Sequence, residues 1–230
     1  MKKGDLKKQE ILITAEELFC KNGYEQTSVQ EIICRLNTSK GSFYHHFVSK
    51  EAVLEAICSN RAKQIYSSAE SECKKSVTVI GSLNSLLSGM IPFRDEKLQF
   101  LLMLLPVFML PEGRIVRQYY CDALSGNFFE AICNQIKNGQ KAGDLYCNDP
   151  ENASMIIISL INLLWTQISD IIICAENKKI LPDLSECLHI TECCRICIER
   201  FLSLPYGSIN LVDISTLRIL TEKIHNHWSV

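Results

Sequence analysis

The sequence predicts an all-α protein, and three observations lead to that prediction. Apolar residues make up 47% of the 230 residues and recur mainly at the three- and four-residue spacing of amphipathic helices. Almost no stretch shows the alternation of a strand. Glycine and proline, which interrupt helices, number only 10 and 6. We expect a small N-terminal head, residues 1–50, and a larger helical body, residues 51–230.

The first expected helix covers residues 6–22. Ile11, Ala15, Leu18 and Phe19 lie at helical spacing and form the stripe that should be buried. Gly23 follows and ends the helix, because glycine readily takes the left-handed conformation found after a last turn.

Residues 27–51, TSVQEIICRLNTSKGSFYHHFVSKE, predict two short helices joined by a tight turn. Thr27–Ser28 offers N-cap hydroxyls for the first helix, and Glu31 completes a capping box with Ser28. Asn37 tolerates the left-handed conformation that lets the chain turn. Thr38–Ser39 can cap the second helix.

The second of these helices has one apolar and one polar side. Phe43 and Phe47 are four residues apart and should both point into the core. The residues left facing outward are polar or aromatic: Lys40, Ser42, Tyr44, His45 and His46. Two helices, a short turn and this exposed surface are the helix-turn-helix plan for entering a DNA major groove.

The run SKGSFYHHFVSKEAVL resembles the recognition-helix signature of the TetR/AcrR family of transcriptional regulators. The upstream run ILITAEELFCKNGYEQTS resembles the first helix of that family and its exit. The resemblance covers roughly the first quarter of the chain. Two positions depart from the family pattern: Asn37 stands where the family often has glycine, and Ile33 is bulkier than the common alanine.

Position by position, the resemblance implies that Gln30 and Lys40 read base edges, since glutamine suits adenine and lysine suits guanine. It places Ser28, Tyr44 and Lys50 at phosphates. An alternative for Tyr44 is that it merely covers the core. The full set of implied DNA contacts is Ser28, Gln30, Lys40, Gly41, Ser42, Tyr44, His45 and Lys50.

The distribution of charge gives weak support for DNA binding by the N-terminal region. Residues 1–63 carry 10 Lys and Arg against 8 Asp and Glu, whereas the remainder carries 14 against 18. Because the positive excess is small, specific contacts must contribute more to DNA affinity than bulk attraction.

The body should be a series of longer helices, expected at residues 49–73, 79–90, 95–109, 112–139, 151–174, 184–202 and 214–228. In the family resembled, such helices bind an effector. The candidate lining residues are apolar or aromatic, and ordinary core packing is the alternative for each: Phe100, Met103, Leu104, Phe108, Tyr119, Phe128 and Trp165.

The resemblance also implies a homodimer, in which residues 151–174 and 184–202 form a four-helix interface with a second copy. A wide apolar stripe on the second of these helices suits that role. Its members are Leu184, Cys187, Leu188, Thr191, Cys194, Ile198, Phe201 and Leu202. The alternative is that this stripe belongs to the core of a single chain.

The twelve cysteines do not predict a disulfide framework, because the charged N-terminus MKKGDLKKQE is unlike a signal peptide. The longest apolar run, Met155–Cys174, is interrupted by polar residues. We therefore expect a cytoplasmic protein with reduced thiols. His189, Cys193 and Cys197 share one helical stripe, but a single helix gives no compact tetrahedral set, so no metal or other cofactor is predicted.

The sequence thus predicts a ligand-responsive, sequence-specific DNA-binding regulator, a repressor by family resemblance. It would bind a palindromic operator as a homodimer and be released by a small apolar or aromatic effector. Two alternatives stay open: a redox- or metal-sensing regulator that uses the C-terminal cysteines, and a helical protein-interaction module without DNA binding. An enzyme is disfavoured, because GxSxG, P-loop, GxGxxG and HExxH motifs are absent from the sequence. No membrane partner is expected.

Overall fold

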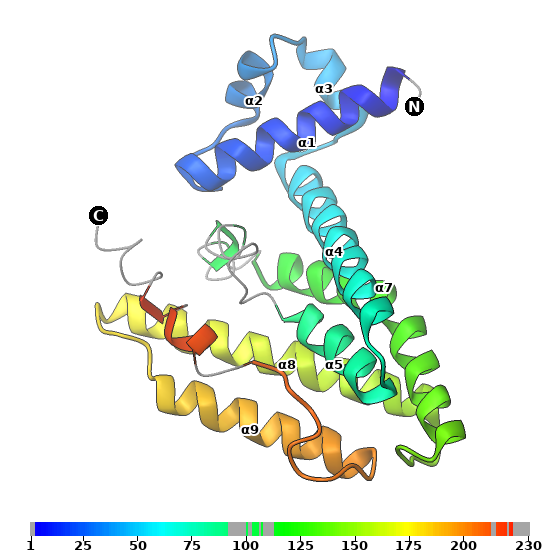
Figure 1. The fold of residues 1–230 in the computed structure, drawn as a ribbon. Helices are drawn as coiled ribbons and strands as arrows, with labels where there is room; N and C mark the ends of the chain where they lie inside the picture. Colours follow the sequence, from blue (N-terminus) through cyan, green and yellow to red (C-terminus); the bar gives the residue numbers. More distant parts are fainter. Residues whose placement is uncertain are drawn as a thin grey trace. The chain divides into compact units, whose positions relative to one another are not determined.

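The computed structural model describes residues 3–91, 100, 103–105, 107, 113–212, 215–219 and 221–222. Within this part of the chain the regular structure is helical throughout (Figure 1). The elements are α1 (Lys3–Asn22), α2 (Val29–Arg35), α3 (Lys40–His46), α4 (Lys50–Lys75), α5 (Val79–Met90), α7 (Gly113–Ala142), α8 (Pro150–Asn177) and α9 (Leu184–Phe201). The predicted all-α class is confirmed.

Most predicted helices differ from these bounds by three residues or fewer at either end, and α5 has the bounds expected from the sequence. The helix predicted at 95–109 lies largely outside the described residues. Of the helix predicted at 214–228, residues 215–219 and 221–222 are described and are helical.

The chain divides into two compact units. The first consists of residues 1–61 and 99–120, and the second of residues 62–98 and 121–230. Helices α4 and α7 each contribute to both units. The predicted domain boundary after residue 50 stays a prediction.

In the first unit, α1 is held by the stripe expected from its sequence. Ile11, Ala15 and Phe19 are fully buried, whereas Leu18 is half-buried. Gly23 has a φ of +86° and ends the helix, and its N–H donates to the Phe19 carbonyl at 3.0 Å. The Tyr24 ring then packs edge-on against Phe19, with 5.1 Å between the ring centroids, so the exit from α1 is fixed by both backbone and side chain.

In the second unit, α8 packs against both α5 and α9. Its inner face is mainly aliphatic, with Trp165 and the serines Ser154 and Ser169 also fully buried. One described segment, Pro150–Ala175, is long and apolar enough to cross a membrane. Its contacts with α5 and α9 account for part of this hydrophobicity, since 44% of the most apolar window is buried.

Glycine sets the distance between α4 and α5. A Cβ placed on Gly89 would lie 2.4 Å from the Cβ of Ala69, closer than real side chains approach. The two helices therefore meet at a point where any side chain larger than glycine would push them apart.

The segment after α9 is tied back onto the second unit by polar contacts. Asn84 on α5 donates from its side chain to the Ser208 carbonyl at 2.9 Å and accepts from the Asn210 N–H at 2.8 Å. Glu199 on α9 is buried and accepts the Ile209 N–H at 2.9 Å. These bonds satisfy backbone groups that a loop would otherwise leave to solvent.

Candidate nucleic-acid interface

The start of α2 is fixed by two hydroxyls with different roles. Ser28 is the N-cap, with φ −94° and ψ 154°, and its Oγ accepts the Glu31 N–H at 3.1 Å. Thr27 is buried instead, and its Oγ1 donates to the Gly23 carbonyl at 2.9 Å. The Ser28 side chain stays at the surface, where its O–H can still donate to a phosphate.

The turn before α3 has the conformation expected from its sequence. Asn37 has a φ of +47°, the left-handed region that asparagine tolerates. Ser39 then caps α3 by accepting the Ser42 N–H at 3.1 Å. These local bonds fix where α3 begins and therefore which of its residues face outward.

Helix α3 separates a buried face from an exposed one. Phe43 and Phe47 are buried, as predicted, and their ring centroids are 6.3 Å apart. Tyr44 is 44% exposed while its ring edge contacts Phe43 at 5.4 Å between centroids. Tyr44 therefore covers part of the core and keeps its outer edge available. Lys40, Gly41 and His45 are exposed, and Ser42 and His46 are half-buried.

Two further positions on this surface are accessible. Gln30 is exposed on α2, with its Nε2 3.4 Å from the Cys34 Sγ. Lys40 places its Nζ 5.9 Å from the Tyr44 ring centroid, so the cation and the phenol form one patch. A Cβ added to Gly41 would meet nothing closer than the Ser39 Oγ at 4.0 Å, so packing within the chain does not require glycine there.

Lys50 has an internal role that the sequence did not indicate. Its Nζ donates to the Tyr24 carbonyl at 2.9 Å and lies 4.1 Å from the Tyr24 ring centroid. The Tyr24 hydroxyl in turn donates to Glu51 at 3.3 Å. Lys50 thus joins the start of α4 to the exit of α1, and a phosphate contact would have to share this cation.

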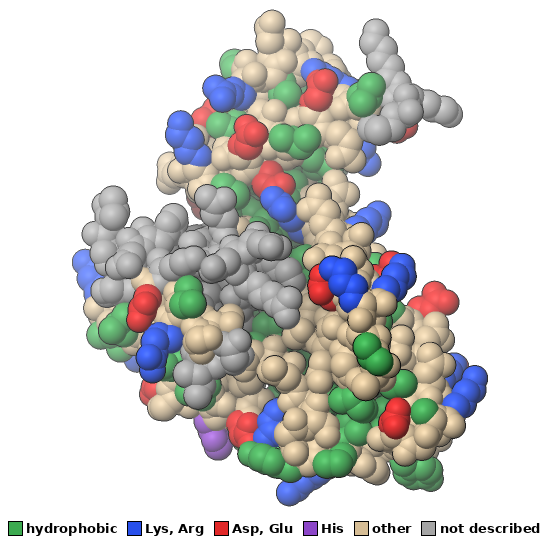
Figure 2. All heavy atoms as spheres, in the orientation of Figure 1, with side chains coloured by type: hydrophobic (Ala, Val, Ile, Leu, Met, Phe, Trp, Pro, Cys, Tyr) green, Lys and Arg blue, Asp and Glu red, His purple; other side chains and the backbone are tan. Residues whose placement is uncertain are grey.

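Charge on this part of the molecule is mixed. On the face drawn in Figure 2, basic and acidic side chains are interspersed over the N-terminal helices. The arrangement agrees with the small positive excess in the sequence and does not form a single-sign field.

The residues predicted to line an effector pocket divide between the two compact units. Phe100, Met103 and Leu104 are buried in the first unit, where Tyr119 is 45% exposed. Phe128 and Trp165 are fully buried in the second unit. Phe108 lies outside the described residues. The effector pocket stays a prediction.

A polar group lies beside one of these residues. The Trp165 Nε1–H donates to the Asn162 side-chain oxygen at 3.2 Å, and the Asn162 amide donates to the Ser125 hydroxyl at 3.0 Å. This link joins α7 to α8 beside the fully buried Trp165 ring.

The stripe predicted for the dimer interface is mostly used within the chain. Five of its members are buried in the second unit: Cys187, Thr191, Cys194, Ile198 and Leu202. The Cys194 thiol points at the Leu160 carbonyl of α8, at 3.7 Å. Leu184 and Leu188 are half-buried, and Phe201 is 41% exposed. The burial of these five residues fits the alternative of a core within one chain, because α9 buries one face against α8; the dimer interface stays a prediction.

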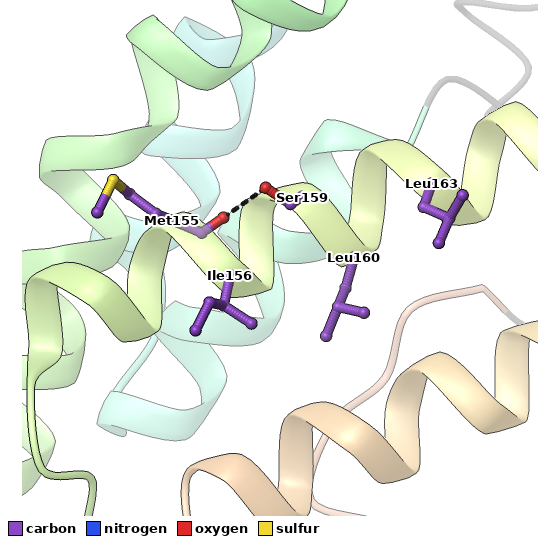
Figure 3. A pocket seen from close by; sticks show the side chains of 5 residues that line it. All are labelled: Met155, Ile156, Ser159, Leu160 and Leu163. Carbon is purple, nitrogen blue, oxygen red and sulfur yellow. Dashed lines mark hydrogen bonds between the residues drawn. The ribbon is translucent and has the colours of Figure 1, made fainter.

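The apolar residues left outside are instead concentrated on α8. We call the group Met155, Ile156, Ser159, Leu160 and Leu163 the α8 surface; it lines a shallow groove of about 290 Å³. Figure 3 shows Ile156, Leu160 and Leu163 projecting from α8 into this open space. Met155, Ile156 and Leu163 are 51%, 44% and 52% exposed. The sequence analysis placed residues 151–174 in the expected dimer interface, but it named individual interface residues only on the helix at 184–202.

The twelve cysteines are all free. Burial raises the pKa of the Cys58 and Cys194 thiols to about 12 and that of Cys20 and Cys187 to about 11, so these stay protonated at neutral pH. Four others, Cys34, Cys174, Cys193 and Cys197, are exposed. Within the described residues no group of three or more possible metal ligands occurs.

Comparison with known proteins places this head in a family. The sequence profile described as "Bacterial regulatory proteins, tetR family" matches residues 11–57. The chain is 34% identical to the uncharacterized HTH-type transcriptional regulator YerO of Bacillus subtilis over 122 residues, 50% of this chain and 40% of YerO. It is 50% identical to the regulator QacR of Staphylococcus aureus over 44 residues, 19% of this chain and 23% of QacR. The matches thus span less than half the length of these relatives.

The fold extends the likeness beyond the head. A crystal structure of a TetR-family transcriptional regulator from Mesorhizobium loti matches 99% of this chain and 97% of its own, with a TM-score of 0.57 and 16% sequence identity. At this identity the likeness concerns the fold of the whole chain, whereas the sequence matches concern mainly the helix-turn-helix. Together, the match over residues 11–57 and their capped helices identify this segment as a helix-turn-helix of the tetR family of bacterial regulatory proteins, and the rest of the chain shares the fold of a solved structure described as a TetR-family regulator.

Proposed function

We propose that the chain is a cytoplasmic transcriptional regulator, a repressor, that binds a palindromic DNA operator through α2 and α3 and releases it when an effector binds the body. The family is one of regulators and not of enzymes. The observation that carries the proposal is the surface of α3, where Lys40, Tyr44 and His45 are exposed on a helix whose other side is anchored by buried Phe43.

The chemistry of this surface suits a major groove. Lys40 donates to guanine acceptors and Gln30 pairs with adenine, while Ser28 and the Tyr44 hydroxyl suit phosphates. Gly41 lets the backbone of α3 approach DNA closely, a role supported by the absence of any packing reason for glycine. Lys50 acts chiefly by holding the head together, with phosphate contact as its second role.

A single α3 reads few base pairs, so specificity calls for a second copy related by a two-fold axis. We assign the interface to the α8 surface together with exposed Phe201, instead of the buried α9 stripe. Exposed apolar groups of this kind are where monomers associate. The groove beside Ile156 and Leu163 would accept side chains of the second copy.

The effector would be a small apolar or aromatic molecule that binds within the body near Phe128 and Trp165. Its affinity must differ between two arrangements of the dimer for it to change operator binding. The Asn162–Ser125 pair offers such a molecule a polar contact.

Operator binding is tested by selecting the DNA duplexes that the protein binds from a pool of random sequences at near-physiological salt. We expect the wild-type chain to enrich a palindrome and the Tyr44→Ala and Lys40→Ala variants to lose it. Lys63→Ala is the matched control, because it removes one exposed lysine from the second compact unit. If Lys40→Ala and Lys63→Ala enrich the same palindrome equally, α3 does not read the operator.

Once a palindrome is known, affinities divide the contacts into two kinds. Lys40→Ala and Gln30→Ala should each cost about 1–3 kcal/mol at the preferred base and blur its selection. Tyr44→Phe should weaken binding to all sequences alike, because phosphate contacts carry no sequence information. A Tyr44→Phe change that altered base preference would contradict this division.

A further inference from the structure

Helix α4 is attached to the head, α1 to α3, at two separate points. Near the start of α4, the Lys50 Nζ donates to the Tyr24 carbonyl at 2.9 Å, just after α1 ends. Further along α4, Arg61 donates from both Nε and Nη2 to one oxygen of Glu16 on α1, each at 2.5 Å. Residues 50 and 61 are separated by about 16 Å along the helix axis, so the two attachments lie well apart.

The second attachment also involves an aromatic ring. The Glu16 side chain is 19% exposed and that of Arg61 is 40% exposed, so the ion pair is partly shielded from water. The Arg61 guanidinium lies 5.6 Å from the centroid of the buried Phe100 ring, within the range of a cation–π contact. Phe100 meets the Tyr120 ring edge-on, with 5.8 Å between the centroids. Since all four residues belong to the first compact unit, Arg61 joins α1 to α4 and to the segment 99–120.

Two attachments restrict the direction of the head more than one does. Within the head, α1 packs against α2 and α2 against α3, so these helices form one small body. A body held at one point can turn about that point, whereas a second point along the same helix fixes its direction. Apolar burial is non-directional, but hydrogen bonds from an arginine to a carboxylate have a preferred geometry. The Glu16–Arg61 pair therefore supplies a direction that the apolar core alone does not.

For a dimeric DNA reader, the direction of each head determines which distance between half-sites it fits. Adding one base pair between two half-sites moves the second by about 3.4 Å along the duplex and turns it by about 35°. Heads held in one direction do not follow such a change, whereas heads that turn freely follow it with little loss of affinity.

We propose that Arg61 is a positioning residue for operator binding: its ion pair with Glu16, supported by Phe100, holds the head in one direction on α4 and thereby restricts the spacing between half-sites. This inference rests on the homodimer and the palindrome of the proposed function. Base contacts come from α2 and α3. The pair therefore determines which spacing is accepted and leaves unchanged which half-site sequence is read.

The test compares duplexes that carry the selected half-sites at the selected spacing and at spacings a few base pairs shorter and longer. The wild-type chain should bind one spacing best. Arg61→Met and Glu16→Gln should each lower that preference by about fivefold or more, as expected when a partly buried ion pair is lost at each of two half-sites. Phe100→Leu should act in the same direction with a smaller effect, because it leaves the ion pair in place.

Matched controls remove a neighbouring charge that lies outside the pair. Glu17→Gln removes an exposed carboxylate from α1, and Lys63→Met removes an exposed cation from α4. Both should keep the wild-type spacing preference. Combining Glu16→Gln with Arg61→Met should lower the preference no further than Arg61→Met alone, because the two residues act through one contact. Additive losses would show that they act separately and would overturn the role of the pair.

The ratio of affinities between spacings separates positioning from folding, because a general loss of stability lowers binding at every spacing alike. An unchanged spacing preference in either Arg61→Met or Glu16→Gln overturns this inference alone. The same holds for a wild-type chain that binds its half-sites equally well at every spacing. A wild-type chain that selects no palindrome overturns the proposed function and this inference with it.

Discussion

The helix-turn-helix and the α8–α9 pair are both built from α-helices, but they expose different kinds of side chain. The head, α1 to α3, buries the aromatic rings of Phe19, Phe43 and Phe47 among aliphatic side chains and exposes polar side chains such as Lys40 and His45 on α3. The α8–α9 pair has an aliphatic core and leaves apolar side chains outside, among them Ile156 and Leu163. The exterior of the head suits a charged partner, and that of the helix pair suits another protein surface.

The difference teaches how each surface is specified. In the head, local bonds determine which residues face outward: the caps at Ser28 and Ser39 and the left-handed Asn37 fix helix starts within a few residues. Helices α8 and α9 each carry more than one apolar stripe, so the face that points outward depends on which stripe the fold buries. That choice is made by packing between distant segments.

The largest loss of stability is expected from Arg195→Met, which breaks the buried ion pair of the second unit. Arg195 donates to both oxygens of Glu199 at 2.7 and 2.6 Å, and the Glu199 side chain is 3% exposed. Removing the cation leaves a buried carboxylate uncompensated, which costs about 3–5 kcal/mol. Denaturant unfolding measures this loss of stability. The control is Arg200→Met, which removes an exposed arginine from the same helix, α9. Equal stability of the two variants would show that Glu199 does not need its partner.

A comparable loss is expected in the head from Phe43→Ala. Phe43 is fully buried, so its removal leaves a cavity and costs about 3–5 kcal/mol. Its neighbour Tyr44 is 44% exposed, so Tyr44→Ala should cost clearly less stability while still abolishing operator selection. Hydrogen exchange resolved by peptide would locate the Phe43→Ala effect in α1 to α3. An effect of equal size in α8 would contradict the division into two units.

A smaller loss is expected where α4 and α5 meet. Gly89→Ala places a methyl group 2.4 Å from the Ala69 Cβ, and the rigid neighbour forces the helices apart at about 1–3 kcal/mol. Gly126→Ala on α7 is the matched control, because its new Cβ has no neighbour within 4 Å. Thermal unfolding should show Gly89→Ala below wild type and Gly126→Ala at or above it. The reverse order would mean that the helices are not in close contact at Gly89.

These contrasts show what sequence reasoning could and could not give. The head was predictable because its signals are local: Gly23, Asn37 and the cap serines act within one turn, and Phe43 with Phe47 marks the buried face. The internal contact of Lys50 with the Tyr24 carbonyl was not predictable, since it joins residues 26 apart.

The α9 stripe shows the limit more clearly. Cys187, Thr191, Cys194 and Ile198 have the spacing of an interface, but the same spacing serves a core, and α8 takes that face. On α8 nearly every position is apolar, so the exposed Ile156 cannot be told from the buried Ile157 by hydrophobicity. Three-dimensional packing makes that distinction.

The smallest effect on stability is expected at Gly41, where function and folding should move in opposite directions. Gly41→Ala adds a Cβ that meets nothing closer than 4.0 Å within the chain, so it should raise stability by up to about 1 kcal/mol through helix propensity. The same methyl group lies on the exposed side of α3 and should hold the helix away from DNA, lowering operator affinity. The melting temperature tests the expected gain in stability, and an operator titration of the same sample tests the expected loss of affinity. Higher stability with unchanged affinity would show that α3 does not approach DNA at Gly41, whereas lower stability would reveal a packing role that the contacts of this glycine do not indicate.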